Sequence, residues 1–220
     1  MESDSKRAIV LMKIFYLNEC SSTQDVAKEY LKNRKPPFGI VAKKQSRGVG
    51  SRGNSWQSDE GNLYFSFCIE QSALAKDIPL ASTSIYFAYL LKEFLSERGS
   101  QIWLKWPNDL FIGDKKIGGV ITSKMKDILI CGIGLNLLNP PPNAQKLDIK
   151  ITIEEIVDGF CKKLKFKPLW KEILSKFLLD FEKSKKFSSH IDGNLSSLQE
   201  ATLCDDGAIL INNKKVYSLR

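Results

Sequence analysis

The stretch LKWPNDLFIGDKKIGGVITSK (residues 104–124) consists of short strand-like segments separated by turn residues. Pro107 ends the first segment, Gly113-Asp114 is typical of a hairpin turn, and a segment rich in β-branched residues follows. Residues 127–138, DILICGIGLNLL, continue the same pattern. Hairpins in succession predict a largely antiparallel or mixed sheet rather than regular β-α-β winding.

The rest of the chain is expected to add further strands and helices to this sheet. Other strands are predicted at residues 13–17, 39–44, 62–70 and 101–106. Helices are predicted from apolar spacing and cap residues at 25–33, 80–98, 152–165 and 169–184. Thr152 and Glu155 are expected to form a capping box. The predicted fold class is α+β, with a central mixed β-sheet and flanking helices.

A change of composition near residue 185 predicts a second, smaller unit. Gly193 and Gly207 are expected turns, and AILIN and KVYSL are expected short strands. We therefore expect a main domain over residues 1–184 and a small C-terminal β-domain over residues 185–220.

The composition limits the classes of function. The 220-residue chain has 33 Lys and Arg against 25 Asp and Glu, and its charge of +8 favours an acidic partner, from nucleic acid to an acidic protein. Five cysteines without a CxxC pair fit a reducing cytosol better than a disulfide framework or a zinc site. His190 is the only histidine, which argues against Ser-His-Asp and Cys-His catalysis. The apolar runs are too short for a signal peptide or a membrane span, so a cytoplasmic protein without a membrane partner is expected.

Residues 45–56, QSRGVGSRGNSW, contain three glycines and two arginines. The glycines allow positive φ and can gather N–H groups into one concavity, while Arg47 and Arg52 add positive charge. The spacing is neither a Walker P-loop nor a dinucleotide-binding fingerprint. From this segment alone, a flexible connector, a nucleic-acid arm and an anion-binding loop all stay open.

Polar side chains also surround Pro107. Because proline restricts the preceding residue to extended geometry, Lys105, Asn108 and Asp109 lie at a strand end where side chains can converge on a ligand. The lysine suits phosphate, and the carboxylate suits Mg²⁺ or a ligand N–H group. The alternative is a solvated turn with a surface ion pair.

Two glycine-containing strands offer further candidates. Lys116 precedes Gly118-Gly119, a pair that marks either a close approach of a ligand or a β-bulge. In GIGLNL, residues 132–137, Asn136 is the only polar side chain, and a buried amide needs hydrogen-bond partners that a ligand can supply.

Taken in order, these segments resemble the signature motifs of the biotin protein ligases. The motifs are SST, the glycine-arginine loop ending in Trp56, KWPNDL, KIGGVI and GIGLN, and the resemblance covers residues 13–138 with a weaker likeness in the tail. It implies a catalytic domain over residues 1–184, with a mixed sheet like that of class II aminoacyl-tRNA synthetases, followed by a small SH3-like β-module.

The resemblance also implies a reaction and its partners. The carboxylate of biotin attacks the α-phosphate of MgATP to give biotinyl-5′-AMP and pyrophosphate. A specific lysine of a biotin carboxyl carrier protein, an acetyl-CoA carboxylase subunit or similar, then takes the biotinyl group as an amide. A cytoplasmic monomer or homodimer is expected.

The implied site residues follow from the matching motif positions. The residues expected to bind biotin or its adenylate are Ser22, Thr23, Gln24, Gln45, Gly48, Gly50, Ser51, Arg52, Trp56, Asn108, Asp109, Lys116, Gly119, Gly132 and Asn136. The residues expected to act in catalysis are Arg52, Lys105 and Lys116. The expected Mg²⁺ ligands are Asp109 and Asn136.

Within this set the resemblance assigns different roles. The biotin head group is expected against Ser22, Thr23, Gln24 and Gln45. The loop is expected to hold carboxylate and phosphate, and Lys116 to contact biotin or the adenylate. Trp56 is either an adenine-stacking surface or a core residue.

The chain departs from the family pattern in the loop. The family usually reads Gly-Arg-Gly-Arg-X-Gly, whereas Val49 and Ser51 occupy the two arginine positions here and Arg52 follows one place later. Because a glycine-rich loop can rotate a neighbour inward, Arg52 is predicted to meet the adenylate phosphate. Family members that repress transcription carry a helix-turn-helix domain before these motifs. The SST motif arrives too early for one, so no DNA partner is expected.

Two rival functions are weighed. A lipoate protein ligase shares the implied fold and chemistry, but its usual Arg-Arg-X-Ser-Gly-Gly-Gly motif is absent and KWPNDL favours biotin. A basic, non-enzymatic nucleic-acid-binding protein would fit the charge, but aromatic residues are not interleaved with the basic ones as stacking platforms.

Overall fold

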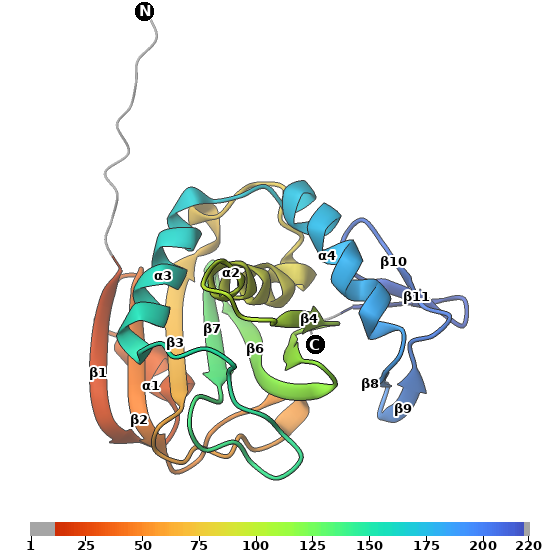
Figure 1. Ribbon diagram of the computed structural model, residues 1–220. Helices are drawn as coiled ribbons and strands as arrows, with labels where there is room; N and C mark the ends of the chain where they lie inside the picture. The colour runs from red at the N-terminus through yellow and green to blue at the C-terminus, as the bar shows by residue number, and fades with distance from the viewer. Residues whose placement is uncertain (1–11, 218–220) are drawn as a thin grey trace, which may run out of the picture.

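The computed structural model describes residues 12–217, apart from the side chain of Arg52, and is built on one seven-stranded sheet (Figure 1). Its strands are β1 (Lys13–Cys20), β2 (Phe38–Gln45), β3 (Leu63–Glu70), β4 (Trp103–Lys105), β5 (Asp109–Ile112), β6 (Lys115–Met125) and β7 (Ile128–Leu135). They lie in the order β1-β2-β3-β7-β6-β5-β4. Only β1 and β2 pair in parallel, and each other neighbouring pair is antiparallel. The predicted mixed sheet is confirmed.

Helices cover both faces of this sheet (Figure 1). The four are α1 (Thr23–Tyr30), α2 (Thr83–Glu97), α3 (Ile153–Phe166) and α4 (Trp170–Ser184), with short 3₁₀ turns at Ser51–Gly53, Gln71–Ala73 and Leu80–Ser82. The helices α2, α3 and α4 share the larger hydrophobic core with one face of the sheet. Helix α1 packs on the opposite face over a small cluster that includes Ala27, Phe38 and Ile130. The α+β class is therefore confirmed.

Strand β3 shows how the sequence builds a two-sided sheet. Successive side chains of a strand point to opposite faces, and all but the last residue of β3 are buried. Phe65 and Phe67 point into the larger core, where each packs against Phe160 with ring centroids 6.0 Å and 5.3 Å apart. Ser66 and Cys68 point to the α1 face, where the thiol packs against the Ala27 carbonyl and the hydroxyl contacts the start of α1. The alternation thus separates a packed face from a face that can hold a site.

Helix α3 begins with the predicted capping box. Thr152 Oγ1 accepts a hydrogen bond from the Glu155 N–H at 3.2 Å, and the Glu155 carboxylate accepts one from the Thr152 N–H at 2.8 Å. Both orphan N–H groups at the start of the helix are satisfied in this way. The helix ends at a left-handed Lys167, after which Pro168 cannot continue it.

Several predicted elements differ in extent, and hydrogen bonds explain two of these differences. Helix α1 ends at Tyr30 rather than residue 33, because the N–H groups of Lys32 and Asn33 bond three residues back in a tightened last turn. Strand β4 begins at Trp103 rather than residue 101, because the Ile102 N–H is taken by Ser100 Oγ at 3.2 Å.

The C-terminal β-module consists of two small sheets. One is the hairpin β8 (Ser188–Ile191) and β9 (Asn194–Ser197), and the other contains β10 (Thr202–Leu203), β11 (Ile209–Ile211) and β12 (Lys214–Val216). The predicted strands correspond to β11 and β12. Strands β8 to β10 were not predicted, because β9 is polar and largely exposed and lacks an apolar alternation. Asp192 and Gly193, both at positive φ, form the hairpin turn.

Two indole groups, one from the turn after β4 and one from the start of α4, contact the module. Trp106 Nε1 donates to the Gly207 carbonyl at 3.0 Å, and Trp170 Nε1 donates to the Asp205 carbonyl at 2.6 Å. The division into domains at residue 185 stays a prediction, and residues 1–11 and 218–220 of those domains lie outside the described part. Within residues 12–217, none of the helices has the length and apolar character needed to cross a bilayer.

The capping box gives a test of the α3 assignment. We expect Thr152→Ala to lower the free energy of unfolding by about 1 kcal/mol, because the Glu155 N–H loses its acceptor. Thr152→Ser keeps the hydroxyl and should stay close to the wild type. Urea unfolding followed by circular dichroism measures both, and equal stability of the alanine variant and the wild type would contradict the assignment.

Candidate functional site

A cavity of about 420 Å³ opens on the α1 face of the sheet. Its floor crosses five neighbouring strands, in the order β2, β3, β7, β6 and β5. Four strand spacings of about 4.8 Å give it a length of roughly 19 Å. The N-terminus of α1, the glycine-arginine loop and residues 141–144 form its walls.

One end of the cavity is polar and uncharged. Gln45 Oε1 accepts hydrogen bonds from the backbone N–H of Thr23 at 2.7 Å and from its hydroxyl at 3.1 Å. The same hydroxyl lies 2.7 Å from Ser66 Oγ. Gln45 Nε2 donates to Ser58 Oγ at 2.9 Å, and Ser58 in turn donates to the Trp56 carbonyl. These bonds fix the amide and hydroxyl groups before any ligand arrives.

Two donors on the floor have no partner among the described residues. Gln24 Nε2 and Trp56 Nε1 are buried, and neither has an acceptor. They lie over Gly132 and Gly134, where an added Cβ would approach the Gln24 amide to 2.6 Å and the Trp56 ring to 2.6 Å. Because an unpaired buried donor is costly, both positions are suited to a ligand that supplies acceptors.

The other end of the cavity is charged. Lys116 Nζ lies 2.5 Å from Asp109 Oδ1 and 5.5 Å from the centre of the Trp56 ring. The β5–β6 pairing changes register between Gly118 and Lys116, so the bulge interpretation of the glycine pair holds. Of the two glycines, Gly119 also lines the cavity. Asn108 Nδ2 donates to the Val120 carbonyl at 2.6 Å, which ties the end of β5 to β6.

The glycine-arginine loop is closed by its own hydrogen bonds. The Gly50 N–H donates to the Asn54 carbonyl at 2.7 Å, and the Trp56 N–H donates to the Gly48 carbonyl at 2.8 Å. Val49 and Ser55 form an antiparallel bridge around the 3₁₀ turn Ser51–Gly53. The loop is therefore a small hairpin that turns its tip toward the cavity, rather than an unstructured connector.

Most of the sequence-predicted site residues meet in this one cavity. Those that line it are Ser22, Thr23, Gln24, Gln45, Gly50, Ser51, Trp56, Asn108, Asp109, Lys116, Gly119, Gly132 and Asn136. Gly48 does not line it but packs against Ser58 Oγ and the Trp56 carbonyl, where a side chain has no room. The Arg52 side chain lies outside the described residues, so its role stays a prediction.

Lys105 is not brought to the cavity. Its side chain is buried, with Nζ 5.5 Å from the Phe111 ring and 5.9 Å from the Phe187 ring, between the sheet and the segment that leads to the C-terminal module. The prediction from strand position was correct for the backbone, since Lys105 pairs with Asp109, but the long side chain points elsewhere.

The sequence reasoning missed several residues of the cavity. Ser66 and Gly134 are the most informative, and others are Asn54, Ser55, Gln57, Tyr64, Val120, Ile121 and Ile133. The sequence contains a feature that could have identified each of these two residues. Ser66 is a lone hydroxyl in an aromatic strand, and Gly134 follows Gly132 at the two-residue period of a strand face.

The titratable groups near the cavity favour binding over thiol chemistry. Burial raises the pKa of Tyr64, whose hydroxyl donates to the Asp59 carbonyl at 2.7 Å and stays neutral. Burial raises the pKa of the Cys68 thiol to about 12, and it also raises the pKa of the Cys131 thiol. Neither thiol supplies a thiolate nucleophile near neutral pH.

The predicted Mg²⁺ ligands do not form a preassembled metal site. Within residues 12–217 there is no group of three or more His, Cys, Asp or Glu side chains that could hold a metal ion. Asp109 is paired with Lys116, and Asn136 Nδ2 donates to the Gln145 carbonyl at 3.2 Å. One carboxylate suits Mg²⁺ only where phosphate oxygens supply the remaining ligands.

Known structures share this fold over almost the whole chain. Biotin acetyl coenzyme A carboxylase synthetase from Helicobacter pylori, with bound biotinylated ATP, is 43% identical with a TM-score of 0.90, covering 94% of this chain and 100% of that one. Biotin protein ligase from Aquifex aeolicus, in complex with biotin and ATP, is 25% identical with a TM-score of 0.76, covering 96% and 97%.

Sequence comparisons agree with the structural ones. The model of the Biotin/lipoate A/B protein ligase family matches residues 16–136. The bifunctional ligase/repressor BirA of Bacillus subtilis is 35% identical over 149 residues, 63% of this chain and 44% of that protein. Biotin--protein ligase 2 of Arabidopsis thaliana is 30% identical over 161 residues, 65% of this chain and 49% of that protein. The chain thus spans about half the length of these relatives.

The glycine pair in β6 provides a matched test of the cavity geometry. A Cβ at Gly118 would lie 2.5 Å from the Gly134 carbonyl oxygen, whereas at Gly119 its nearest neighbour is 3.5 Å away. We expect Gly118→Ala to lower the free energy of unfolding by about 1–3 kcal/mol through overpacking, and Gly119→Ala to change it by less than about 0.5 kcal/mol. Urea titration measures both variants, and equal losses would contradict the β6–β7 packing.

Proposed function

Because the chain belongs to the biotin/lipoate A/B protein ligase family, we propose that it is an ATP-dependent biotin–protein ligase. It activates biotin to biotinyl-5′-AMP and transfers the biotinyl group to a lysine of a biotin carboxyl carrier protein. The relatives named for biotin ligation, and the Helicobacter pylori structure with biotinylated ATP, support this reaction.

The observation that carries the proposal is the polarity of the two ends of the cavity. Fixed amide and hydroxyl groups at one end suit the ureido ring of biotin, which offers a carbonyl acceptor and two N–H donors. The unpaired Gln24 Nε2 needs an acceptor there. Lipoate presents an apolar dithiolane instead, which leaves that donor buried and unpaired. A site built to hydrogen-bond its substrate rejects an analogue that lacks the partner.

The charged end suits the reacting groups. Biotin bound with its ring near Thr23 and Gln45 directs its valerate carboxylate along the floor toward Lys116. A carboxylate oxygen attacks the α-phosphorus of ATP, the new O–P bond forms, and pyrophosphate leaves. The Lys116 ammonium is placed to offset charge on the carboxylate and on the phosphoryl oxygens. No side chain has to remove a proton, since the nucleophile is already ionised.

The hairpin loop and Trp56 shield the mixed anhydride from water. The Trp56 ring packs against Gly134, and loop residues Val49 to Ser51 form the wall above the floor. Excluding water preserves the intermediate until the carrier lysine attacks its carbonyl carbon and AMP leaves.

Mg²⁺ is proposed to enter with ATP. Its ligands would be phosphate oxygens together with Asp109, with Asn136 nearby, and it would offset charge on the leaving pyrophosphate. A metal ion held mainly by phosphate oxygens fits a cavity whose charged end contains the single carboxylate of Asp109.

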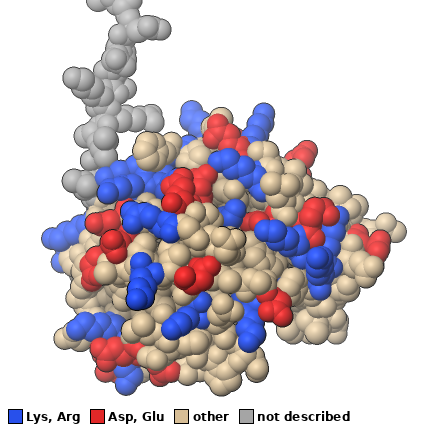
Figure 2. All heavy atoms as spheres, viewed as in Figure 1, with Lys and Arg blue, Asp and Glu red and all other residues tan. Residues whose placement is uncertain are grey.

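The acceptor and the location of the protein are also proposals. A net charge of +8 favours an acidic carrier domain. In the face seen in Figure 2, Lys and Arg side chains alternate with Asp and Glu side chains rather than forming one basic stripe, which disfavours a nucleic-acid role. All five cysteines are free, as expected in the cytoplasm.

One assay tests substrate, reaction and acceptor together. We expect incubation with biotin, MgATP and a biotin carboxyl carrier domain to add one biotinyl group to the carrier, detected by intact mass. Lipoate in place of biotin should be used at least about 10²-fold less efficiently, because Gln24 Nε2 stays unpaired. Omitting ATP is the control. Efficient lipoyl transfer without biotinyl transfer would replace the proposal with the lipoate alternative.

The loop arginine gives a second test. We expect Arg52→Ala to slow adenylate formation by about 10-fold or more and to speed release of biotinyl-5′-AMP, because a charge-assisted contact to phosphate is lost. Arg47→Ala removes an exposed arginine from the same loop and is the matched control. Pyrophosphate exchange and adenylate retention on a desalting column measure the two steps. If both variants behave as the wild type, Arg52 has no such role.

A further inference from the structure

Strand β4 is the last strand of the sheet, yet its outer edge is not open. Alternate N–H groups along a strand point to opposite edges, so those of Leu104 and Trp106 point away from β5. The Leu104 N–H donates to Asp180 Oδ2 at 3.0 Å, and the Trp106 N–H donates to Ser184 Oγ at 3.1 Å. Both acceptors are side chains of α4, so the helix supplies the bonds that a further strand would make.

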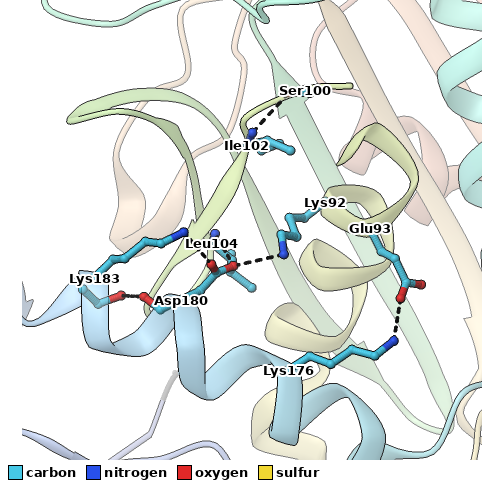
Figure 3. A network of polar contacts seen from close by, with 9 residues as sticks. Lys92, Glu93, Ser100, Ile102, Leu104, Lys176, Asp180 and Lys183 are labelled. Atoms are coloured by element: carbon cyan, nitrogen blue, oxygen red, sulfur yellow. Dashed lines mark hydrogen bonds and ion pairs between the residues drawn. The ribbon is translucent and has the colours of Figure 1, made fainter. Parts of the chain in front are cut away.

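Asp180 is held for this task by cations from two helices (Figure 3). Its side chain is only 4% exposed, and Lys92 of α2 lies 3.5 Å from Oδ2 while Lys183 of α4 lies 3.2 Å from Oδ1. A buried carboxylate is tolerated where it is paired and hydrogen-bonded. The Leu104 N–H and the two ammonium groups together satisfy both of its oxygens.

Ser184, one helical turn after Asp180, is the second α4 side chain that accepts a hydrogen bond from this edge. The Ser184 hydroxyl donates to the backbone carbonyl of Asp180 at 3.2 Å and accepts from the Trp106 N–H. The bond to Asp180, within α4, fixes the orientation of the hydroxyl hydrogen. Trp106 is fully buried, and its indole N–H is held by the Gly207 carbonyl at 3.0 Å. The residue before Pro107 is thus held at its backbone by α4 and at its side chain by the C-terminal module.

These contacts lie next to the charged end of the cavity along the chain. Trp106 is followed by Pro107 and then by Asn108 and Asp109, both of which line the cavity. Pro107 leaves little backbone freedom between Trp106 and Asn108. A shift of Trp106 is therefore transmitted to Asp109 and to its ion-pair partner Lys116. The residues assigned to the biotin head group lie at the start of α1 and at the end of β2, and they do not depend on this link.

We propose that Asp180 and Ser184 are positioning residues for the nucleotide end of the site, which they never touch. The proposal rests on the proposed function, because it assigns the charged end to ATP and the adenylate phosphate. It predicts a selective defect: ATP use and adenylate formation suffer, whereas biotin binding does not.

The chain offers a matched control for a purely structural role. Glu93 of α2 also pairs with a lysine of α4, since its carboxylate lies 2.8 Å from Lys176, and it pairs with Lys163 of α3 as well (Figure 3). These contacts of Glu93 run to α3 and α4 and not to β4. Glu93→Gln therefore disturbs helix packing with the same chemical change as Asp180→Asn.

The test compares Asp180→Asn, Ser184→Ala and Glu93→Gln in the full chain. We expect the first two to raise KM for ATP or lower kcat for pyrophosphate exchange by about 10-fold, since small misplacements at a reacting centre are costly. Their Kd for biotin should stay within about twofold of the wild type. Glu93→Gln should leave both quantities unchanged, and Ser184→Thr, which keeps the hydroxyl, should restore the rate.

Amide hydrogen exchange gives a readout that does not depend on activity. In Ser184→Ala the Trp106 amide should lose protection selectively, while amides of β3 keep theirs. If Asp180→Asn does not fold, the comparison of Ser184→Ala with Ser184→Thr tests the proposal. Kinetics of Ser184→Ala equal to those of Glu93→Gln, or a parallel loss of biotin and ATP binding, would overturn the proposal. A wild-type protein that forms no biotinyl-5′-AMP would instead overturn the proposed function.

Discussion

The alternation of side chains along β3 and β7 is the constraint on which the site depends. One face of these strands must fill the core, and Phe65, Phe67 and Ile133 do so. The residues between them must then face α1, and there the chain has Ser66, Gly132 and Gly134. Small residues at these positions leave space beneath Gln24 and Trp56. A shift of one residue in the pairing would exchange the two sets and destroy core and cavity together.

The alternation along β3 and β7 also explains which parts of the fold and of the site can be predicted from the sequence. The strands of the main sheet, the capping box and the hairpin turns follow from local rules, so their positions were predicted well, whereas the short strands β8 to β10 were not predicted. The cavity residues were found because they occur in short motifs at strand ends, and thirteen of them do line one cavity. Ser66 was missed because a single serine in a strand carries no motif. Lys105 was misplaced because its side chain can extend to either side of the strand end, and only packing against Phe111 and Phe187 selects one.

The charges of the cavity are arranged more specifically than the net charge of the chain indicates. The formal charge of +8 is spread over surface lysines, many of which pair with Asp or Glu on the same helix or on a neighbouring one. Among the described side chains that line the cavity, the charge is concentrated in one ion pair, Lys116 with Asp109. An anionic ligand near Lys116 competes with Asp109 for that ammonium group, and the carboxylate that it displaces becomes free to serve a cation. In the function we propose, substrate and metal charges would enter this same end, and neither Lys116 nor Asp109 would be left unpaired.

The edge of the sheet meets two requirements with one set of contacts. An open edge strand presents unpaired N–H groups that invite pairing with another chain. In β4 the Leu104 and Trp106 groups are instead bound by Asp180 and Ser184, four residues apart on α4. Side chains at that helical spacing lie one above the other, and alternate N–H groups of a strand recur at nearly the same distance. The helix can therefore protect the edge and fix the backbone before Pro107 at once. The segment that leads from β4 to the charged end of the site is thus held by residues more than seventy positions away along the chain.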